Sequence, residues 1–366
     1  MKKILFVSAF VPCKNTAGQN YTRLLLIELS NFFSIDIICF DGFHHTLDEV
    51  VKDKVNTIEI VKTDNVSRLL GFLQIPFYHP FFCTRFSWQT VRKIKSLTKK
   101  TKYDWVYLDF SQSFIYGLFI DSVPKILMCH DVISQFYRRR QSIVNYWWSM
   151  ISEKRLLHQS NSTVFSFSEK DKGLIYSSYG CKSFVTPFFI SDLIYNLPKK
   201  ITVGKSFVFY GAWNRVENSE SLLFFLDEVC PLLSKPYSIV IIGGGLPKAI
   251  IDKIENMPSI EYKGFVENPY VVLSESIALI APLRRGAGVK VKVVEAIACG
   301  CPIIGSEIAF EGISSQFRDM MINAETAEQY KDIIESIDVS LEIRYNNRDK
   351  MINYCHNKPI IDYLNN

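Results

Sequence analysis

The sequence predicts two Rossmann-like α/β domains, each with a doubly wound parallel sheet, that face a cleft. Its 366 residues, 48% of them hydrophobic, are enough to form two cores. Strand-like runs alternate with helix-like runs in both halves, as in parallel sheets covered by helices. A break containing Pro and Lys at 196–200 separates the halves. We expect an N-terminal domain at 1–195, a C-terminal domain at 196–345, and a helical segment at 346–366 that packs back toward the first domain.

The first half contains short apolar runs that are typical of buried strands. Its opening run follows two lysines and imitates a secretory signal, but it is short and lacks a small-residue cleavage site, so a buried strand is the better interpretation. The expected elements are strands at Lys3–Phe10, Ile35–Phe40, Trp105–Leu108, Lys125–Cys129 and Ser162–Phe167, with a helix near Gln19–Phe33.

The second half repeats the alternation and adds glycines after its strands. Doubly wound sheets bind ligands at the carboxyl ends of their strands, so we expect Gly211, Gly243, Gly245 and Gly264 to line a binding edge. The expected elements are strands at Ser206–Tyr210, Tyr237–Ile242, Ile260–Lys263, Ile277–Ala281 and Pro302–Gly305, with helices over Ser219–Leu233 and Lys290–Cys299.

A Gly-rich turn before the second of these helices predicts an anion site. Gly286 and Gly288 let backbone N–H groups approach a ligand, while Lys290 and Lys292 add charge at the helix N-terminus. Glu295 lies on the same helix within about two turns and can reach hydroxyl groups of the same ligand. A ligand with phosphate and hydroxyl groups is a nucleotide sugar. The plainer interpretation is an ordinary turn followed by a helix with a Lys–Glu pair.

The segment from Gly286 to Pro302 closely resembles the donor-site signature of the retaining glycosyltransferases of family four, the "glycosyl transferases group 1" proteins of GT-B fold. Gly211, Gly243, Gly245 and the triplet Gly264-Phe265-Val266 follow the family's order. In the first half, Ala17-Gly18 resembles its N-terminal acceptor loop and His130-Asp131 its histidine loop.

The resemblance implies a UDP- or GDP-linked sugar donor, held in the second domain and transferred with retention of configuration. It implies that Gly286, Ala287, Gly288 and Val289 surround the diphosphate together with Lys290 and Lys292. Glu295 would hold the ribose hydroxyls, and residues 264–266 would contact the base. Ala17, Gly18 and His130 would lie on the acceptor side, with His130, Lys290 and Glu295 as the catalytic residues.

Two departures and several plainer alternatives stand beside this interpretation. Many members carry a glutamate where this chain has Ala287, so the motif does not indicate which sugar is transferred. The N-terminal loop has one glycine where many members have two or three, so the identity of the acceptor stays open. His130 could be a satisfied core histidine, but its position after an apolar strand and directly before Asp131 favours a location in the cleft. Arg215 could contact the diphosphate or be a solvated loop arginine.

Charge is distributed unevenly along the chain. Residues 1–195 hold 24 Lys and Arg against 16 Asp and Glu, a net charge of +8, whereas residues 196–366 hold 18 against 21, a net charge of −3. Aromatic residues cluster near the basic ones at 72–88 and 146–148. These features are typical of a surface that contacts anionic lipid, although a solvated helix face beside core aromatics would produce the same pattern. No signature of a nucleic-acid-binding module accompanies them.

Other motifs narrow the cofactors and the compartment. There is no D-x-D triplet and no His/Cys cluster, so we expect no metal and no further cofactor. The nine cysteines show no pairing order, and no run reaches the ~18 apolar residues of a membrane span. We expect a cytoplasmic protein that could associate peripherally with the inner face of the membrane.

The leading hypothesis is a hexosyltransferase that builds a bacterial surface polysaccharide, such as capsule, O-antigen or lipopolysaccharide, on a glycan or lipid-linked acceptor. A sugar-nucleotide epimerase or a phosphorylase on the same fold is an alternative within enzymes. A catalytically silent binding protein is the alternative from another class, and the intact lysines, glycines and Glu295 argue against it.

Overall fold

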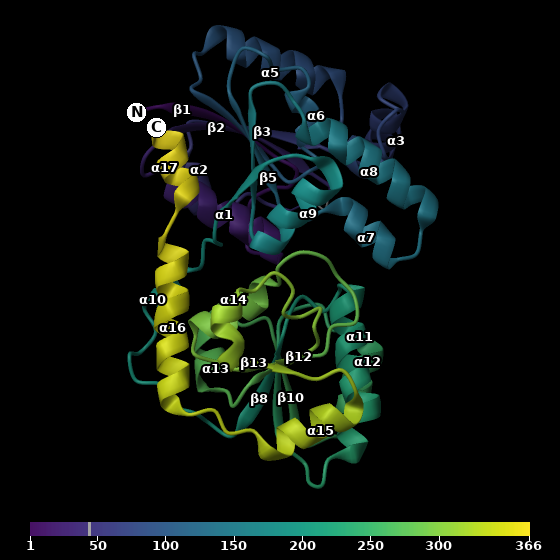
Figure 1. Ribbon diagram of the computed structural model, residues 1–366, viewed down its shortest axis with the longest axis vertical. Coiled ribbons are helices and arrows are strands. Elements are labelled where there is room, and N and C mark those ends of the chain that lie inside the picture. Colours follow the sequence, from purple (N-terminus) through teal and green to yellow (C-terminus); the bar gives the residue numbers. More distant parts are fainter. Residues whose placement is uncertain (43–44) are drawn as a thin grey trace. The chain divides into compact units, whose positions relative to one another are not determined.

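The protein, described by a computed structural model over residues 1–42 and 45–366, divides into two compact units (Figure 1). The first comprises Met1–Phe189 and Lys358–Asn366, and the second comprises Ile190–Asn357. Each unit contains one all-parallel sheet flanked by helices, so the predicted fold class of two Rossmann-like α/β domains is confirmed. The division falls after Phe189 where the sequence suggested 195, and residues 346–357 group with the second unit.

The sheet of the first unit has seven strands in the order β3-β2-β1-β4-β5-β6-β7. Strand β1 lies inside the sheet, pairs with β2 and β4, and is almost entirely buried, which explains its continuous apolar run. The strands are β1 Lys3–Ser8, β2 Ser34–Asp41, β3 Thr57–Lys62, β4 Trp105–Asp109, β5 Lys125–Cys129, β6 Ser162–Ser166 and β7 Ser183–Val185.

The helices of this unit begin mostly at polar capping residues. Thr16, Asp64, Ser87 and Ser168 each accept a hydrogen bond from a backbone N–H in the first turn of the helix that follows. The helices are α1 Ala17–Leu29, α2 Glu49–Lys54, α3 Asn65–Gln74, α4 Pro80–Cys83, α5 Trp88–Lys100, α6 Phe114–Gly117, α7 Ile133–Arg139, α8 Ile143–Leu157, α9 Glu169–Tyr179 and α17 Pro359–Asn365.

The sheet of the second unit has six strands in the order β10-β9-β8-β11-β12-β13. Its strands are β8 Ser206–Tyr210, β9 Ser238–Ile242, β10 Ile260–Gly264, β11 Leu279–Ala281, β12 Ile303–Gly305 and β13 Met321–Asn323. Its helices are α10 Asp192–Tyr195, α11 Val216–Phe224, α12 Lys248–Ile254, α13 Pro269–Glu275, α14 Val291–Ala298, α15 Ala327–Ser336 and α16 Leu341–His356, with 3-10 turns at Cys230–Leu232 and Ser315–Met320.

The helix predicted at Ser219–Leu233 is interrupted. It begins earlier, at Val216, and passes from α11 into a π-helical turn at Phe225–Val229 before the 3-10 turn. Pro231 lies in that last turn, where its missing N–H and its ring prevent a regular α-helical continuation.

The two C-terminal helices belong to different units. Arg348 of α16 donates to the carbonyls of Pro198 (2.8 Å) and Leu197 (3.2 Å), which holds α16 to the second unit. In contrast, the carbonyl of Leu364 in α17 accepts from Trp105 Nε1 at 3.0 Å, and Figure 1 shows α17 beside the start of β1.

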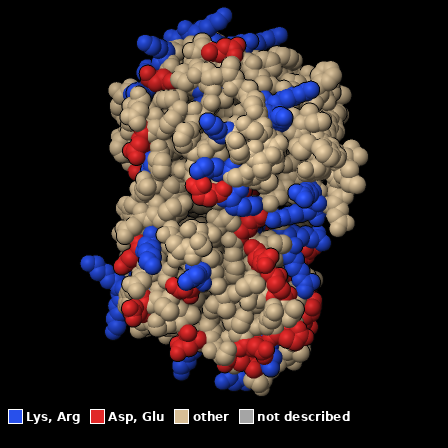
Figure 2. Space-filling view, viewed as in Figure 1, with Lys and Arg blue, Asp and Glu red and all other residues tan. Residues whose placement is uncertain are grey.

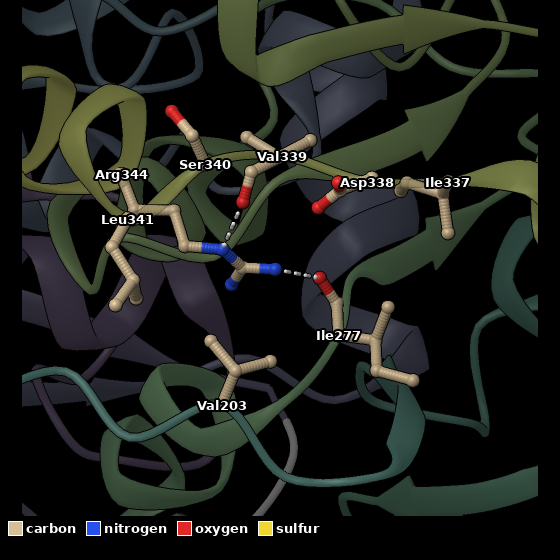
Figure 3. A pocket seen from close by; sticks show the side chains of 8 residues that line it. All are labelled: Val203, Ile277, Ile337, Asp338, Val339, Ser340, Leu341 and Arg344. Carbon is tan, nitrogen blue, oxygen red and sulfur yellow. Dashed lines mark hydrogen bonds between the residues drawn. The ribbon is translucent and has the colours of Figure 1, made fainter.

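A pocket of about 320 Å³ lies in the second unit beside the N-terminus of α16 (Figure 3). The guanidinium of Arg344 donates to the carbonyls of Ile277 (2.6 Å) and Val339 (3.3 Å), so its donors are used within the fold. Ile277 precedes β11, which places the pocket at the end of the sheet opposite to the strand ends where ligands bind. We therefore assign this pocket a structural role.

Among residues 1–42 and 45–366, no helix is long and apolar enough to cross a membrane.

Candidate functional site

The glycines predicted to line a binding edge meet at the carboxyl ends of β8, β9 and β10. Gly243 has φ +114°, and a Cβ built on it would lie 1.9 Å from the carbonyl oxygen of Gly211. Its N–H donates to the carbonyl of Gly264 at 2.7 Å. Gly245 has φ +81°, and a Cβ there would meet Asn214. These backbones are in contact because no side chain intervenes.

The Gly-rich turn after β11 leads into α14. Gly286 has φ +133° and Gly288 has φ +66°, both in the region that favours glycine. Ala287 and Val289 alternate with them, so the turn presents mainly backbone. Lys290 is the N-cap residue of α14 and gives no side-chain cap, which leaves the first N–H groups of the helix for other partners.

Three cationic side chains surround this turn. Lys290 Nζ donates to the carbonyls of Gly288 (2.6 Å) and Ala287 (3.2 Å) and lies 3.7 Å from the Glu311 carboxylate. Lys292 Nζ donates to Asn218 Oδ1 at 2.9 Å. The guanidinium of Arg215 pairs with Glu217.

The charge balance of this cluster is visible in the pKa of Lys292. Burial of the ammonium, followed by repulsion from Arg215 and Lys290, lowers the pKa of Lys292 to about 7. Burial and the two neighbouring positive charges both disfavour the protonated form of Lys292. An anion placed among the three side chains would reverse the repulsion, so the cluster is suited to bind phosphate.

Glu295 is buried on α14 and contacts tyrosines. Its Oε1 accepts a hydrogen bond from the Tyr270 hydroxyl at 2.9 Å, and Tyr210 is a second hydroxyl donor. Burial raises the pKa of Glu295 to about 7 despite these hydrogen bonds. Sequence reasoning missed both tyrosines, although Tyr210 ends a predicted strand. A ligand hydroxyl at Glu295 would join or replace these donors.

The loop after β10 presents an exposed aromatic side chain. Gly264 has φ +65° with open space around it, and the Phe265 side chain is 71% exposed. Val266 is partly buried beside it. An exposed aromatic ring next to backbone groups at a strand end can stack on or cover a planar ligand.

His130 lies in the first unit, after β5, and is part of a buried pair. Its Nε2 is 2.8 Å from Asp109 Oδ1, and Asp109 Oδ2 accepts from Thr22 Oγ1 at 2.5 Å. Asp109 is fully buried, and the His130 side chain is 11% exposed. The carboxylate therefore fixes the imidazole ring and leaves Nδ1 for another partner.

Phe110 connects His130 to the predicted acceptor loop. Its ring stacks on the His130 ring with centroids 3.7 Å apart. A Cβ on Gly18 would lie 3.0 Å from the same ring, so Gly18 permits α1 to approach. Ala17 is the first residue of α1. Phe110 has φ 65°, which is strained for a bulky residue and typical of functional sites.

The predicted residues thus form two groups, one in each unit. Ala17, Gly18 and His130 lie in the first; Gly211 to Glu295 lie in the second. Sequence reasoning missed Asp109, Phe110 and Thr22, although Asp109 directly follows the predicted strand at Trp105–Leu108. Within residues 1–42 and 45–366, no group of three or more His, Cys, Asp or Glu side chains could hold a metal ion.

Comparisons with known proteins agree with this description. Residues 204–337 match the family described as "Glycosyl transferases group 1". A Klebsiella pneumoniae protein, "Uncharacterized 44.6 kDa protein in cps region", is 21% identical over 351 residues, covering 88% of each chain.

Several solved structures share the fold across both units. Sucrose-phosphate synthase from Thermosynechococcus elongatus is 13% identical with a TM-score of 0.69, covering 97% of this chain and 95% of that one. HepE of Anabaena, in complex with UDP and glucose, is 13% identical with a TM-score of 0.67 and full coverage of both chains. WaaG, a glycosyltransferase involved in lipopolysaccharide biosynthesis, is 10% identical with a TM-score of 0.63, covering 99% and 97%.

These findings support a glycosyltransferase of the group 1 type with the GT-B fold. The segment that matches the family lies wholly in the second unit and includes Gly211, Arg215, Lys290, Lys292 and Glu295.

Proposed function

We propose that the protein transfers a sugar from a UDP- or GDP-linked donor, with retention of configuration, to a glycan or lipid-linked acceptor. The product is a bacterial surface polysaccharide, made at the cytoplasmic face of the membrane. The cluster of Arg215, Lys290 and Lys292 at the Gly-rich strand ends carries this proposal. The relative from a cps region and the likeness to WaaG favour a polysaccharide product.

The cluster has the chemistry that departure of a nucleoside diphosphate requires. When the bond between the anomeric carbon and the diphosphate breaks, negative charge builds on the departing oxygen. Lys290, Lys292, Arg215 and the backbone N–H groups around Gly286 and Gly288 are held in place before the reaction, so they stabilise that charge without rearranging. This role needs no metal from the protein.

The acceptor oxygen attacks the anomeric carbon from the face that the diphosphate leaves, through an oxocarbenium-like state, and its proton passes to the departing diphosphate. Asp109 orients His130, whose Nδ1 then contacts the sugar or the acceptor. Glu295 holds the ribose hydroxyls in place of the tyrosine hydroxyls. Phe265 and Val266 cover the base.

Donor-dependent release of free nucleotide tests the proposal. Thermal-shift screening against UDP, GDP, ADP and CMP selects the base first, because a ligand at ~100 times its Kd adds about 2.7 kcal/mol of stability. The full chain is then incubated with the matching nucleotide sugars and a glycan acceptor. Release of nucleotide with a glycosylated product supports transfer. Sugar isomerisation on the nucleotide identifies an epimerase, and binding without any product identifies a silent binding protein.

A further inference from the structure

Helix α3 presents an apolar side to solvent. Val66, Leu69, Leu70 and Leu73 occur at i, i+3, i+4 and i+7, which places them on one side of the helix, and each is between 48% and 65% exposed. Gly71 lies on the packed side, where an added Cβ would be 2.5 Å from the carbonyl of Cys83. The close packing at Gly71 fixes which side of α3 faces outward.

Helix α8 presents a second apolar stripe. Ile143, Val144, Trp147 and Ile151 are between 48% and 75% exposed, while its inner side is buried. The two helices are neighbours, since the rings of Phe72 in α3 and Trp148 in α8 lie 6.2 Å apart. We call these two stripes together the α3–α8 face. Eight exposed apolar side chains on two neighbouring helices are more than scattered exposure produces and mark an interaction site.

The charge beside this face is mainly positive, with the exposed Asp64 at the start of α3 as an exception. Residues 65–103 hold eight Lys and Arg, and residues 132–152 hold three Arg, with no Asp or Glu in either segment. The three arginines, Arg138, Arg139 and Arg140, are exposed directly before α8. Figure 2 shows a mostly uncharged surface along the edge of the first unit where α3 and α8 lie, with blue side chains where α7 lies.

A hollow of about 450 Å³ lies between α7, the first turn of α8 and α9. It is lined by Arg138, Arg139 and Gln135 from α7 and by Tyr146 from α8, which also carries the apolar stripe. Guanidinium and amide groups are donors to phosphate oxygens, and the adjoining aliphatic and indole side chains suit hydrocarbon.

We propose that the α3–α8 face docks the protein on an anionic phospholipid bilayer, with a lipid phosphate in the hollow lined by Arg138 and Arg139. This inference deepens the proposed function, on whose lipid-linked acceptor it rests. Helices of this kind lie in the membrane interface with their apolar side buried and their cations against the headgroups. A second copy that packed through the same face would cover the apolar side, but residues 65–103 and 132–152 contain no Asp or Glu to pair with the arginines.

The surface differs from the one that the aromatic clusters suggested. Phe82 and Phe86 of the 72–88 cluster are core residues, and Phe72, Tyr78 and Phe81 are partly buried, whereas Phe77 and Trp88 of the same cluster are exposed. The exposed residues are mainly aliphatic ones that the aromatic count overlooked.

Flotation of the full chain with vesicles tests the proposal. The protein should float with phosphatidylglycerol-containing vesicles, less so at high salt, and only weakly with pure phosphatidylcholine. Leu69→Glu with Leu73→Glu, and separately Ile143→Glu with Val144→Glu, should each lower the partition coefficient at least about tenfold. Arg138→Gln with Arg139→Gln should lower it roughly 30-fold for anionic vesicles only, from about 1 kcal/mol per arginine. Val50→Glu, at an exposed apolar position of α2, is the matched control and should leave binding unchanged.

Equal flotation of all variants, or loss with Val50→Glu as well, would overturn the proposal. Sedimentation velocity tests whether a second copy covers the face instead. That outcome requires that the parent chain is a dimer and does not float, and that each double-Glu variant is a monomer. Affinity for nucleoside diphosphate is measured in parallel on every variant. If vesicle binding behaves as expected but no nucleotide binds, the docking surface stands and the proposed function fails.

Discussion

In both units the candidate site residues lie at the carboxyl ends of the strands of a parallel sheet, but the side chains gathered there differ. In the second unit, glycine turns bring backbone and three cations together around a space suited to phosphate. In the first unit, a buried carboxylate fixes one histidine beneath an aromatic ring. In the proposed reaction, the cations of the second unit would stabilise the leaving diphosphate, and the fixed histidine of the first unit would contact the sugar or the acceptor. The division of labour follows from side chains placed on a common backbone plan.

The backbone contact at Gly243 should be the most sensitive point of the second unit. Gly243→Ala places a Cβ against the Gly211 carbonyl at positive φ, so we expect at least ~3 kcal/mol of lost stability and loss of nucleotide binding. Gly244→Ala is the matched control, because nothing lies within 4 Å of its added Cβ. Urea unfolding measures both. Similar effects from the two substitutions would show that the contact is unimportant.

Loss of the His130–Asp109 pair in the first unit should slow turnover without changing the affinity for the donor. Asp109→Asn removes the carboxylate that orients His130, and we expect transfer to slow by about 100-fold, as when a group that positions the reactants is displaced by about 1 Å. The Kd for nucleoside diphosphate should change less than about twofold. Single-turnover transfer and calorimetric binding distinguish the two. A matching loss of donor affinity would make Asp109 a residue of general structural importance.

In contrast to Asp109, Lys290 should affect the affinity for the donor. Lys290→Ala removes a cation that answers the diphosphate, so we expect nucleoside diphosphate to bind roughly 10- to 150-fold more weakly, as for a charge-assisted contact of about 1.5–3 kcal/mol. Binding of the bare nucleoside should not change. Arg285→Ala is the control, since Arg285 pairs with Glu220 on the surface. Equal losses for nucleoside and diphosphate would remove Lys290 from the phosphate site.

The second unit was the easier one to predict from sequence. Its turn from Gly286 to Lys292 and the helix to Glu295 form one continuous segment, so local spacing already brings the groups together. His130 could be placed at a strand end, but its partner Asp109 lies 21 residues earlier and meets it only because β4 and β5 are neighbours. The same holds for Asn218, which is 74 residues from Lys292.

Strand and boundary predictions succeeded where burial is continuous. Lys125–Cys129 and Ser206–Tyr210 match the predicted bounds because both runs are apolar and end at polar or glycine residues. The edge strand β3 was missed because most of its residues are exposed and it has no long apolar run. The grouping of α16 with the second unit depends on Arg344 and Arg348 donating to distant carbonyls, which no local pattern indicates.

The protonation of Lys292 offers the finest test of the phosphate site. Its pKa is lowered to about 7 in the free protein, and a bound diphosphate should raise it by supplying an opposite charge. Binding above pH 7 must therefore take up a proton, and nucleoside diphosphate should bind about fivefold more weakly at pH 8 than at pH 7. Calorimetry in buffers of different ionisation enthalpy measures the uptake directly. Lys292→Met should abolish the uptake, whereas Arg285→Ala should retain it. Proton uptake that persists in Lys292→Met would assign the titration to another group and leave Lys292 outside the diphosphate contacts.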